Sequence, residues 1–441
     1  MGDKKSLVTK AKNIAKKVWY AKNDVVYKMR YHEVKKDKPE YLSNMEDGFL
    51  RVRITNQCNG KCRYCGLLSW PEEERRQSMD PKWLYEYMVP LYEKVKMVLI
   101  TGGDALVAKE SYNYFKFLSE NYPQITIEME SNGIAFDDKY QRLFADNLVN
   151  SHFSINASNE EFFVKSCWDG QGGEYAYNKL TGNIENYLQL LEKENKICFA
   201  PHVSMVINKD NHEDVVPFLE YCLDKRFRGI NYYFDYTESN MTADYFSDDG
   251  KNRETLRTLL EIERLLKNKV FINFRLWIPL KEIETVEKEG YEKNIDKLVE
   301  KYPRIYELSK DRSIHDECKS RNELRRKQGK KTYSIEEEFS ISMRLEEVNG
   351  KNVCFAPWKE IDIYPNGRLD FCGWFHKTLN LNDFIRNEKV DWNEILNHPK
   401  FKLGRKDVLE GKFWGCMECC PMNAKHKAVE QICEHALDEY Q

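Results

Sequence analysis

The sequence predicts an α/β fold in which strands and helices alternate, followed by a charged helical region and a small cysteine-rich region. Short apolar runs alternate with helical patterns six times between residues 49 and 236. Residues 237–350 are highly charged and poor in glycine, and residues 351–441 hold six of the thirteen cysteines. The 441 residues carry a net charge of −3. A chain-wide positive field for nucleic acid or an anionic membrane is therefore excluded.

The repeated unit is a short strand followed by a helix. The predicted strands are Phe49–Thr55, Met97–Thr101, Ile125–Glu130, His152–Asn156, Ile197–Ile207 and Gly229–Tyr236. Helical patterns with an N-cap residue or an early proline lie between them, at Pro81–Lys94, Ser111–Asn121, Asp137–Asn147, Asn178–Glu194 and Glu213–Lys225. Such an alternation indicates parallel strands with right-handed crossovers. The pattern alone fits a partial barrel and a doubly wound sheet equally well.

Three further regions flank or follow this repeat. Residues 1–46 have apolar residues at helical spacing and predict an amphipathic helical extension before the barrel or sheet of residues 47–236. Residues 237–350 predict a mostly helical insertion, with helices at Glu254–Lys267 and Glu292–Lys301 and one strand at Val270–Ile278. Residues 351–441 begin with Cys354–Phe375, where Pro-Asn-Gly between alternating flanks predicts a β-hairpin.

The composition indicates the cellular compartment of the protein and therefore the redox state of its cysteines. No run of about 18 apolar residues is present, and no apolar segment follows the basic start of the chain. We therefore expect a cytoplasmic protein without a membrane partner, whose thiols stay reduced. Clustered cysteines in such a protein indicate metal or iron–sulfur binding, whereas the isolated ones in the middle of the chain are expected to be packing residues.

The first cysteine cluster lies on one short loop after the first strand. Cys58, Cys62 and Cys65 fall within eight residues, and three close thiolates suit a zinc or iron–sulfur site. No further cysteine or histidine follows until His152, so a local zinc site would lack its fourth ligand. An iron–sulfur cube held by three cysteines would instead keep one iron open for another ligand.

The segment CNGKCRYC resembles the CxxxCxΦC signature of the radical S-adenosylmethionine (SAM) enzymes, with Tyr64 in the aromatic position. The resemblance implies a partial (β/α)6 TIM-like barrel over roughly residues 49–236, a SAM-binding 4Fe-4S cluster on Cys58, Cys62 and Cys65, and SAM as cofactor. Further motifs follow in the family's order and mark expected SAM-binding residues. These are Gly102, Gly103 and Asp104 in place of the family's GGE, Asn132 in a TNG-like turn, and Ser154 and Asn156 on the fourth strand.

The second cysteine cluster resembles the SPASM/twitch domains of the same family. Cys354, Gly367 and Cys372 match the first half of that pattern, and Cys416 and Cys419 supply a further CxxC. The resemblance implies one auxiliary 4Fe-4S cluster on Cys354, Cys372, Cys416 and Cys419, with Cys433 as an alternative ligand and Cys420 as a spare thiol. A structural zinc in the same tail is the alternative, since four thiolates also suit zinc.

The resemblance implies an oxidoreductase or lyase that forms a 5′-deoxyadenosyl radical, with an electron donor such as flavodoxin or ferredoxin as partner. We expect a hydroxyl-rich small-molecule substrate such as a sugar, cyclitol or nucleotide-sugar, undergoing dehydrogenation, dehydration or epimerisation. Polar residues expected at the barrel mouth are Glu128, Glu130, His202, Ser204, Tyr233 and Asp235. The candidate catalytic residues among them are Glu130, His202, Tyr233 and Asp235. Arg275 and Trp277, in the predicted strand of the insertion, are further candidates for substrate contact.

Two alternatives to this prediction remain. The substrate could be a ribosomally made peptide, although only about fifty residues precede the first strand, too few for a separate leader-binding domain. The chain could also be a non-catalytic zinc or iron–sulfur binding module that scaffolds partners.

Overall fold

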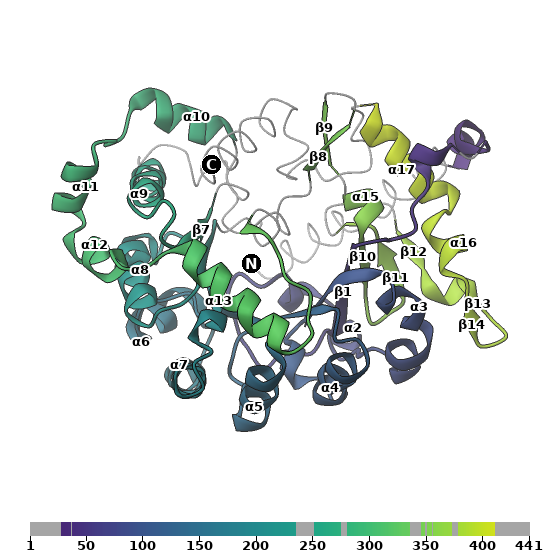
Figure 1. Ribbon diagram of the computed structural model, residues 1–441, viewed down its shortest axis with the longest axis horizontal. Coiled ribbons are helices and arrows are strands. Elements are labelled where there is room, and N and C mark those ends of the chain that lie inside the picture. Colours follow the sequence, from purple (N-terminus) through teal and green to yellow (C-terminus); the bar gives the residue numbers. More distant parts are fainter. Residues whose placement is uncertain are drawn as a thin grey trace, which may run out of the picture.

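A mixed sheet of ten strands organises the part of the chain that the structure describes, in the order β12-β11-β10-β1-β2-β3-β4-β5-β6-β7 (Figure 1). The structure is a computed structural model that describes residues 28–36, 38–234, 251–274, 280–335, 345–348, 351–354, 356–372 and 378–410. All pairings from β1 to β7 are parallel. These strands are β1 (Gly48–Thr55), β2 (Val95–Gly102), β3 (Thr126–Ser131), β4 (Asn150–Ser154), β5 (His202–Ile207), β6 (Gly229–Phe234) and β7 (Phe271–Asn273).

The six predicted strands are therefore all present, and the large parallel sheet confirms the α/β class. Helices connect the strands and gather along the outside of the sheet (Figure 1). They are α2 (Glu72–Arg75), η4 (Trp83–Tyr87), α3 (Val89–Tyr92), α4 (Ser111–Asn121), α5 (Asp138–Asn147), α6 (Glu160–Phe162), η6 (Phe163–Cys167), α7 (Gly173–Lys193) and α8 (Val215–Asp224).

Proline interrupts or shortens two of the predicted elements. The predicted helix Pro81–Lys94 is broken into a π-helical turn, η4, and a short helix, α3. Pro90 lacks the N–H that a continuous helix would need there. The predicted strand Ile197–Ile207 begins only at His202, and Ile197–Phe199 is a 3-10 turn, η7. Pro201 cannot donate to the ladder, so a central strand starts after it.

The described part of residues 237–350 is largely helical. It contains α9 (Lys251–Leu265), α10 (Leu280–Glu289), α11 (Ile295–Lys301), α12 (Pro303–Ser309) and α13 (Ile314–Lys327). The predicted strand Val270–Ile278 appears as β7, which pairs with β6 and adds a seventh parallel strand to the six expected. Arg275, Trp277 and Asp235 lie outside the described residues.

The predicted hairpin within Cys354–Phe375 is present and shorter. Cys354 ends β9 (Lys351–Cys354), which pairs with β8 (Leu345–Val348), and a helical turn, α15 (Ala356–Lys359), follows. The hairpin itself consists of β10 (Glu360–Ile363) and β11 (Arg368–Asp370), with Gly367 at a φ of 84° in the turn. Unexpectedly, β10 pairs in parallel with β1, so the hairpin continues the main sheet.

The remaining elements close the sheet edge beyond β11. They are β12 (Leu379–Asn380), η10 (Leu381–Phe384), β13 (Ile385–Arg386), β14 (Lys389–Val390), α16 (Trp392–Leu396) and α17 (Pro399–Leu409). The described end of the predicted N-terminal extension forms η1 (Tyr31–Val34) and η2 (Pro39–Tyr41), and Arg30 pairs with Asp407 of α17 at 2.7 Å. None of the helices in these ranges is long and apolar enough to cross a membrane.

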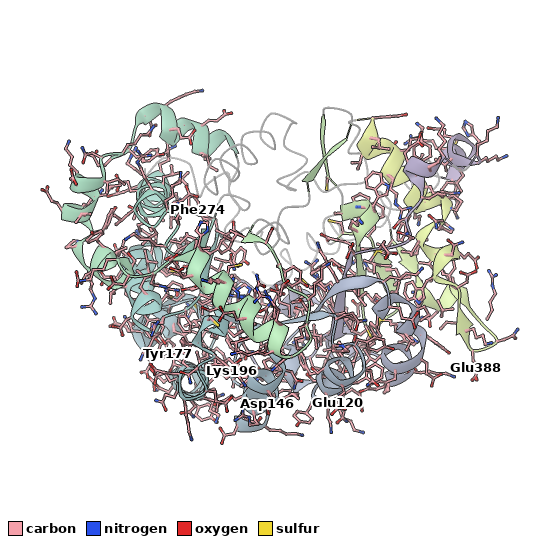
Figure 2. The ribbon with its side chains drawn as sticks, viewed as in Figure 1. Glu120, Asp146, Tyr177, Lys196, Phe274 and Glu388 are labelled. Atoms are coloured by element: carbon pink, nitrogen blue, oxygen red, sulfur yellow. The ribbon has the colours of Figure 1, made fainter. Side chains whose placement is uncertain are left out.

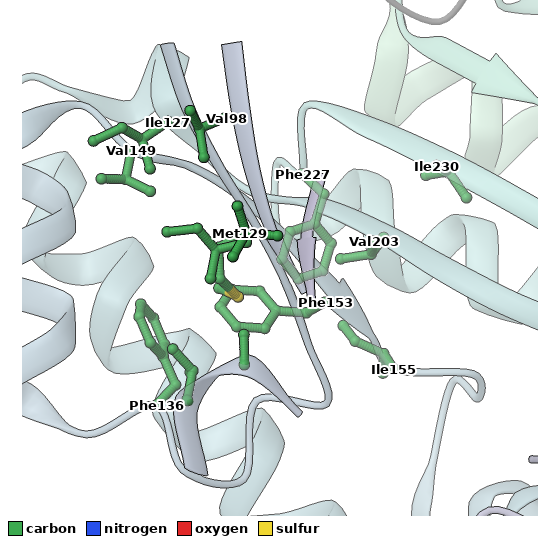
Figure 3. Packing of buried hydrophobic residues seen from close by; sticks show 14 of the residues in the cluster. Val98, Ile127, Met129, Phe136, Val149, Phe153, Ile155, Val203, Phe227 and Ile230 are labelled. Carbon is green, nitrogen blue, oxygen red and sulfur yellow. The ribbon is translucent and has the colours of Figure 1, made fainter. Parts of the chain in front are cut away.

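The two faces of the parallel sheet differ sharply in polarity, because side chains alternate along each strand. Figure 3 shows buried apolar side chains of the face that packs against the helices, among them Met129, Phe153, Val203 and Ile230, and the rings of Phe153 and Phe136 are 4.9 Å apart. Each of these side chains is fully or almost fully buried. Burial of this outer face fixes the register of every strand, since a slip by one residue would turn the apolar side chains to the other face.

Candidate active site

The opposite face of the sheet, here called the inner face, collects the polar residues. Residues paired between parallel strands point to the same side, and the pairs Arg51–Leu99, Leu99–Glu128 and Glu128–Asn150 extend this side from β1 to β4. The polar members of the inner face are Arg51, Arg53, Thr101, Thr126, Glu128, Glu130, Asn150, His152, Ser154, His202, Ser204, Asn231, Tyr233 and Asn273.

Five of the polar residues expected at the barrel mouth thus share one face. They are Glu128, Glu130, His202, Ser204 and Tyr233, whose orientation the sequence left open. Thr101 Oγ1 donates a hydrogen bond to Glu130 Oε2 at 3.0 Å. Burial, followed by the nearby carboxylates of Glu130 and Glu128, raises the pKa of Tyr233, so its phenol stays protonated at neutral pH.

On this face His152 lies beside Glu130, and His202 lies beside His152. Glu130 pairs with His152 and His152 with His202, and the two imidazole rings are 6.5 Å apart. Burial is the largest cause that lowers both histidine pKa values, and Arg228 adds to it. Both shifts favour the neutral form of the rings. His152 was not predicted as a site residue. It lies two positions before Ser154 on the fourth strand, and this spacing indicates that the two side chains point to the same face.

The three candidate cluster cysteines lie on the loop that leaves the carboxyl end of β1. Cys58 is exposed, and Cys62 and Cys65 are partly buried. A Cβ atom placed on Gly60 would lie 3.3 Å from Cys58 Sγ and 3.7 Å from Cys62 Sγ, so both sulfurs face the same turn of the loop. The Gly60 N–H donates to Cys58 Sγ at 3.2 Å.

The predicted motif of Gly102, Gly103 and Asp104, at the end of β2, packs against the start of this loop. The Gly103 N–H donates to Thr55 O at 2.7 Å, and the Asp104 N–H donates to Gln57 O at 2.8 Å. A Cβ atom at Gly102 would lie 2.1 Å from Thr55 O, and one at Gly103 would lie 2.3 Å from Gln57 O. Only glycine allows the two chains to approach this closely.

Asp104 connects the ends of β2 and β3 through its buried carboxylate. Its Oδ1 accepts from the Leu106 N–H at 2.9 Å. Its Oδ2 accepts from Ser131 Oγ at 2.9 Å and from the Asn132 N–H at 2.8 Å. Burial raises the pKa of Asp104, and these three donors oppose that shift. Asp104, which stands where the family usually has glutamate, thus accepts hydrogen bonds from three groups of this chain with its two carboxylate oxygens.

Replacing Asp104 by asparagine is expected to lower the free energy of unfolding by about 1–3 kcal/mol, because one amide N–H₂ would face a donor where an oxygen now accepts. Urea unfolding followed by circular dichroism measures this change. The matched control is Asp80→Asn, since Asp80 is exposed and its Oδ1 accepts one N–H, from Lys82, which an asparagine oxygen can also do. Equal loss in both variants would contradict the connecting role of Asp104.

Asn132 joins the end of β3 to the cysteine loop. Its side-chain Nδ2 donates to Asn59 Oδ1 at 2.7 Å and lies 3.6 Å from Cys58 Sγ. Its Oδ1 accepts from the Ile134 N–H at 2.9 Å. The structure therefore brings this predicted cofactor-binding residue into direct contact with the first cysteine.

The other predicted SAM-binding residues occupy different surroundings. Ser154 is exposed on the inner face, with Ser204 Oγ at 3.4 Å from its hydroxyl. Asn156 has a φ of 67° and ties β4 to β5, because its Oδ1 accepts from the Val206 N–H and its Nδ2 donates to Ser154 O. The Tyr64 ring packs into the core with its hydroxyl beside the Cys167 thiol.

The donor chemistry of the loop fits an iron–sulfur cluster better than one metal ion. Among the described residues no three His, Cys, Asp or Glu side chains converge closely enough to hold one ion. A single zinc draws every sulfur to about 2.3 Å, whereas a cluster takes each thiolate on a different iron and so spaces them more widely. Burial raises the pKa of the Cys58 thiol to about 11, and bound iron would reverse this by ligating the thiolate.

The predicted auxiliary ligands are only partly described. Cys354 is partly buried and Cys372 is buried, both against the main hydrophobic core. Cys416, Cys419, Cys420 and Cys433 lie outside the described residues. The auxiliary cluster and the SPASM/twitch assignment therefore stay predictions.

The parallel sheet carries three cysteines on the loop after β1 and the pair Gly102 and Gly103 at the end of β2. Residues 52–222 match the family described as the Radical SAM superfamily. The family implies a 4Fe-4S cluster and SAM.

Known relatives share this part of the chain. A GTP 3',8-cyclase of Sulfurovum sp. (strain NBC37-1) is 23% identical over 184 residues, which cover 41% of this chain and 52% of that protein. One of Campylobacter curvus (strain 525.92) is 30% identical over 116 residues, covering 26% and 36%. The chain thus spans about half of these relatives or less. The crystal structure of Streptococcus suis SuiB aligns at a TM-score of 0.48 and 12% identity, over 82% of this chain and 68% of that one.

Proposed function

We propose that the protein is a radical SAM enzyme that binds a polar, hydroxyl-bearing small molecule on the inner face and abstracts a hydrogen atom from it. The observation that carries this proposal is the position of the polar inner face, which ends at the same edge of the sheet as the cysteine loop. In parallel α/β sheets ligands bind at the carboxyl ends of the strands. The cluster, when bound, supplies the electron that cleaves SAM to a 5′-deoxyadenosyl radical.

Residues of the inner face would bind and orient the substrate and transfer protons to and from it. The Glu130 carboxylate, held by Thr101, offers its remaining lone pairs to substrate hydroxyl groups. The neutral imidazoles of His152 and His202 can accept a proton from a substrate hydroxyl as its carbon is oxidised. The protonated phenol of Tyr233 can donate one. This division of roles suits dehydrogenation or dehydration.

Two features bear on the kind of substrate. The arginines at β1 are already paired with the hairpin, since Arg51 donates to both oxygens of Asp362 at 3.1 Å and Arg53 lies 3.7 Å from the same carboxylate. Because Asp362 already pairs with both arginines, their charges are less available to an anionic ligand, and this favours a hydroxyl-bearing substrate over a highly charged one. The relatives' name, GTP 3',8-cyclase, makes a nucleotide the second candidate and the first compound to test.

We extend the proposal to one auxiliary 4Fe-4S cluster on Cys354, Cys372, Cys416 and Cys419. Its support is the hairpin pairing between β10 and β11, which ends two residues before Cys372. With both clusters the chain would hold about eight irons. An auxiliary cluster near the inner face would accept an electron from the substrate radical and make the net reaction a two-electron oxidation.

Anaerobic reconstitution tests the proposal. We expect about eight irons per chain and 5′-deoxyadenosine that forms only when a reductant is added. Cys354→Ala should lose about four irons and keep SAM cleavage, which separates the two clusters. Stoichiometric zinc without SAM cleavage would instead establish the non-catalytic module. Candidate sugars, cyclitols, nucleotides and peptides are then compared by deuterium transfer into 5′-deoxyadenosine, and transfer from a peptide alone would overturn the small-molecule proposal.

A further inference from the structure

The cysteine loop is bound on one side by a segment that the family motifs do not include. After η6 the chain runs antiparallel to the loop, and Cys62 forms a β-bridge with Trp168. The Arg63 N–H donates to Cys167 O at 2.9 Å, and the Asp169 N–H donates to Lys61 O at 2.8 Å. The backbone on both sides of Cys62 is therefore hydrogen-bonded to this segment, although more than one hundred residues separate the two in sequence.

The side chain of Arg63 adds three contacts to the same segment. Its Nε donates to Trp168 O at 2.6 Å, its Nη1 to Lys165 O at 2.8 Å, and its Nη2 lies 3.4 Å from Val164 O. A guanidinium presents its donors in a fixed planar fork, so three carbonyl oxygens around it define one position of the arginine. Because Arg63 directly follows Cys62, that position also fixes the cysteine.

The contact continues into the core beneath the loop. The Tyr64 hydroxyl is buried beside the Cys167 thiol, and Cys167 Sγ lies 3.6 Å from Asn156 O. Asn156 is in turn bonded to β5 through the Val206 N–H. The loop is thus tied to the ends of β4 and β5 as well as to Asn132 at the end of β3.

We propose that Arg63 is a positioning residue for the cluster: it locks the backbone of Cys62 onto residues 164–169 and carries a permanent positive charge on the residue that directly follows the ligand. This inference rests on the proposed function, because it needs a cluster on the loop. A cation close to an iron–sulfur cluster stabilises its reduced, more negative state and raises its reduction potential. Arg63 would therefore set both the geometry and the potential of the electron donor to SAM.

The test compares Arg63→Gln, Arg63→Lys and wild type as full-length, anaerobically reconstituted protein. We expect Arg63→Gln to shift the cluster's reduction potential to a more negative value and to slow 5′-deoxyadenosine formation about 10- to 100-fold, as loss of a ligand's supporting contacts typically does. Arg63→Lys keeps the positive charge but lacks the planar set of donors of a guanidinium. Its reduction potential should therefore be closer to the wild-type value than its rate of 5′-deoxyadenosine formation is. Electron paramagnetic resonance of the reduced cluster reports the change in its surroundings.

Arg142→Gln is the matched control. Arg142 also makes several charged contacts, to Asp146 and Glu194, on the outer helix α5, where Figure 2 shows Asp146 at the edge of the molecule. Its replacement should change neither potential nor rate.

Hydrogen–deuterium exchange of the metal-free protein separates the possible outcomes. The Arg63 and Asp169 amides should lose protection in Arg63→Gln. If wild type binds iron and cleaves SAM while the variant keeps its potential and rate, the positioning role is overturned and the proposed function stands, whatever the exchange shows. If wild type binds no iron, the proposed function fails and the cluster role of Arg63 fails with it, even where the amides lose protection.

Discussion

A chain in which Cys58, Cys62 and Cys65 are all replaced by alanine should bind about four fewer irons than wild type and form no 5′-deoxyadenosine. The three sulfurs are on one loop, and none of these residues is in the buried core. Their removal should therefore leave the free energy of unfolding of the metal-free chain within about 0.5 kcal/mol of wild type. Iron and sulfide analysis, together with chromatography of 5′-deoxyadenosine after reduction, measures the loss.

The control for this experiment is Cys222→Ala. Cys222 is fully buried in the hydrophobic core, and we expect it to act as a packing residue. Its replacement should leave iron content and SAM cleavage unchanged while it lowers stability by about 1 kcal/mol. SAM cleavage that survives in the triple variant would show that the electron reaches SAM from another site, and the assignment of the loop cysteines would fall.

The sequence predicted the parallel core well because its signals are local. Each strand from β1 to β6 lies in a short run that is apolar or alternates in polarity, and helices such as α4 begin and end at the predicted residues. Prolines disrupted two of the predicted elements, and their effect was also local. The cysteine loop, Gly102, Gly103 and Asn132 each stand at the end of a strand, and parallel pairing brings these ends to one edge of the sheet, where they make contact.

What the sequence could not predict depends on pairing between distant segments. The parallel pairing of β10 with β1 joins residues more than 300 positions apart, and nothing in a four-residue strand specifies its partner. The orientation of Glu130 or His202 needed the register of the whole sheet. The contact between Arg63 and Trp168 was invisible for the same reason, since an arginine inside a cysteine motif has no periodicity that reveals its acceptors.

Gly102→Ala is expected to destabilise the protein on the order of 3 kcal/mol, because overpacking and a disfavoured backbone conformation add together. The added Cβ would lie 2.1 Å from Thr55 O and 3.1 Å from Thr55 C, and the backbone φ is 149°. Thr55 has little freedom to move away. Its carbonyl accepts from the Gly103 N–H, and its hydroxyl lies 3.1 Å from Gln77 O and 2.8 Å from Ser78 Oγ.

Gly182→Ala provides the comparison for this substitution. Gly182 lies inside helix α7, and a Cβ atom there meets nothing within 4 Å. That variant should gain up to about 1 kcal/mol, since alanine is the better helix former. Urea unfolding of both variants measures the two opposite changes, and an unchanged midpoint for Gly102→Ala would contradict the close packing of β2 on β1.

The strain at Gly102 should also reach the cysteine loop, because Thr55 is only three residues before Cys58. Gly102→Ala protein that is still folded, as judged by circular dichroism at low temperature, should therefore bind less iron than Gly182→Ala protein under the same conditions. Loss of iron from folded protein separates a displaced loop from global unfolding. If the folded fraction instead takes up iron and cleaves SAM as wild type does, the glycine pair serves strand packing alone, and the loop keeps its geometry through Asn132 and the 164–169 segment.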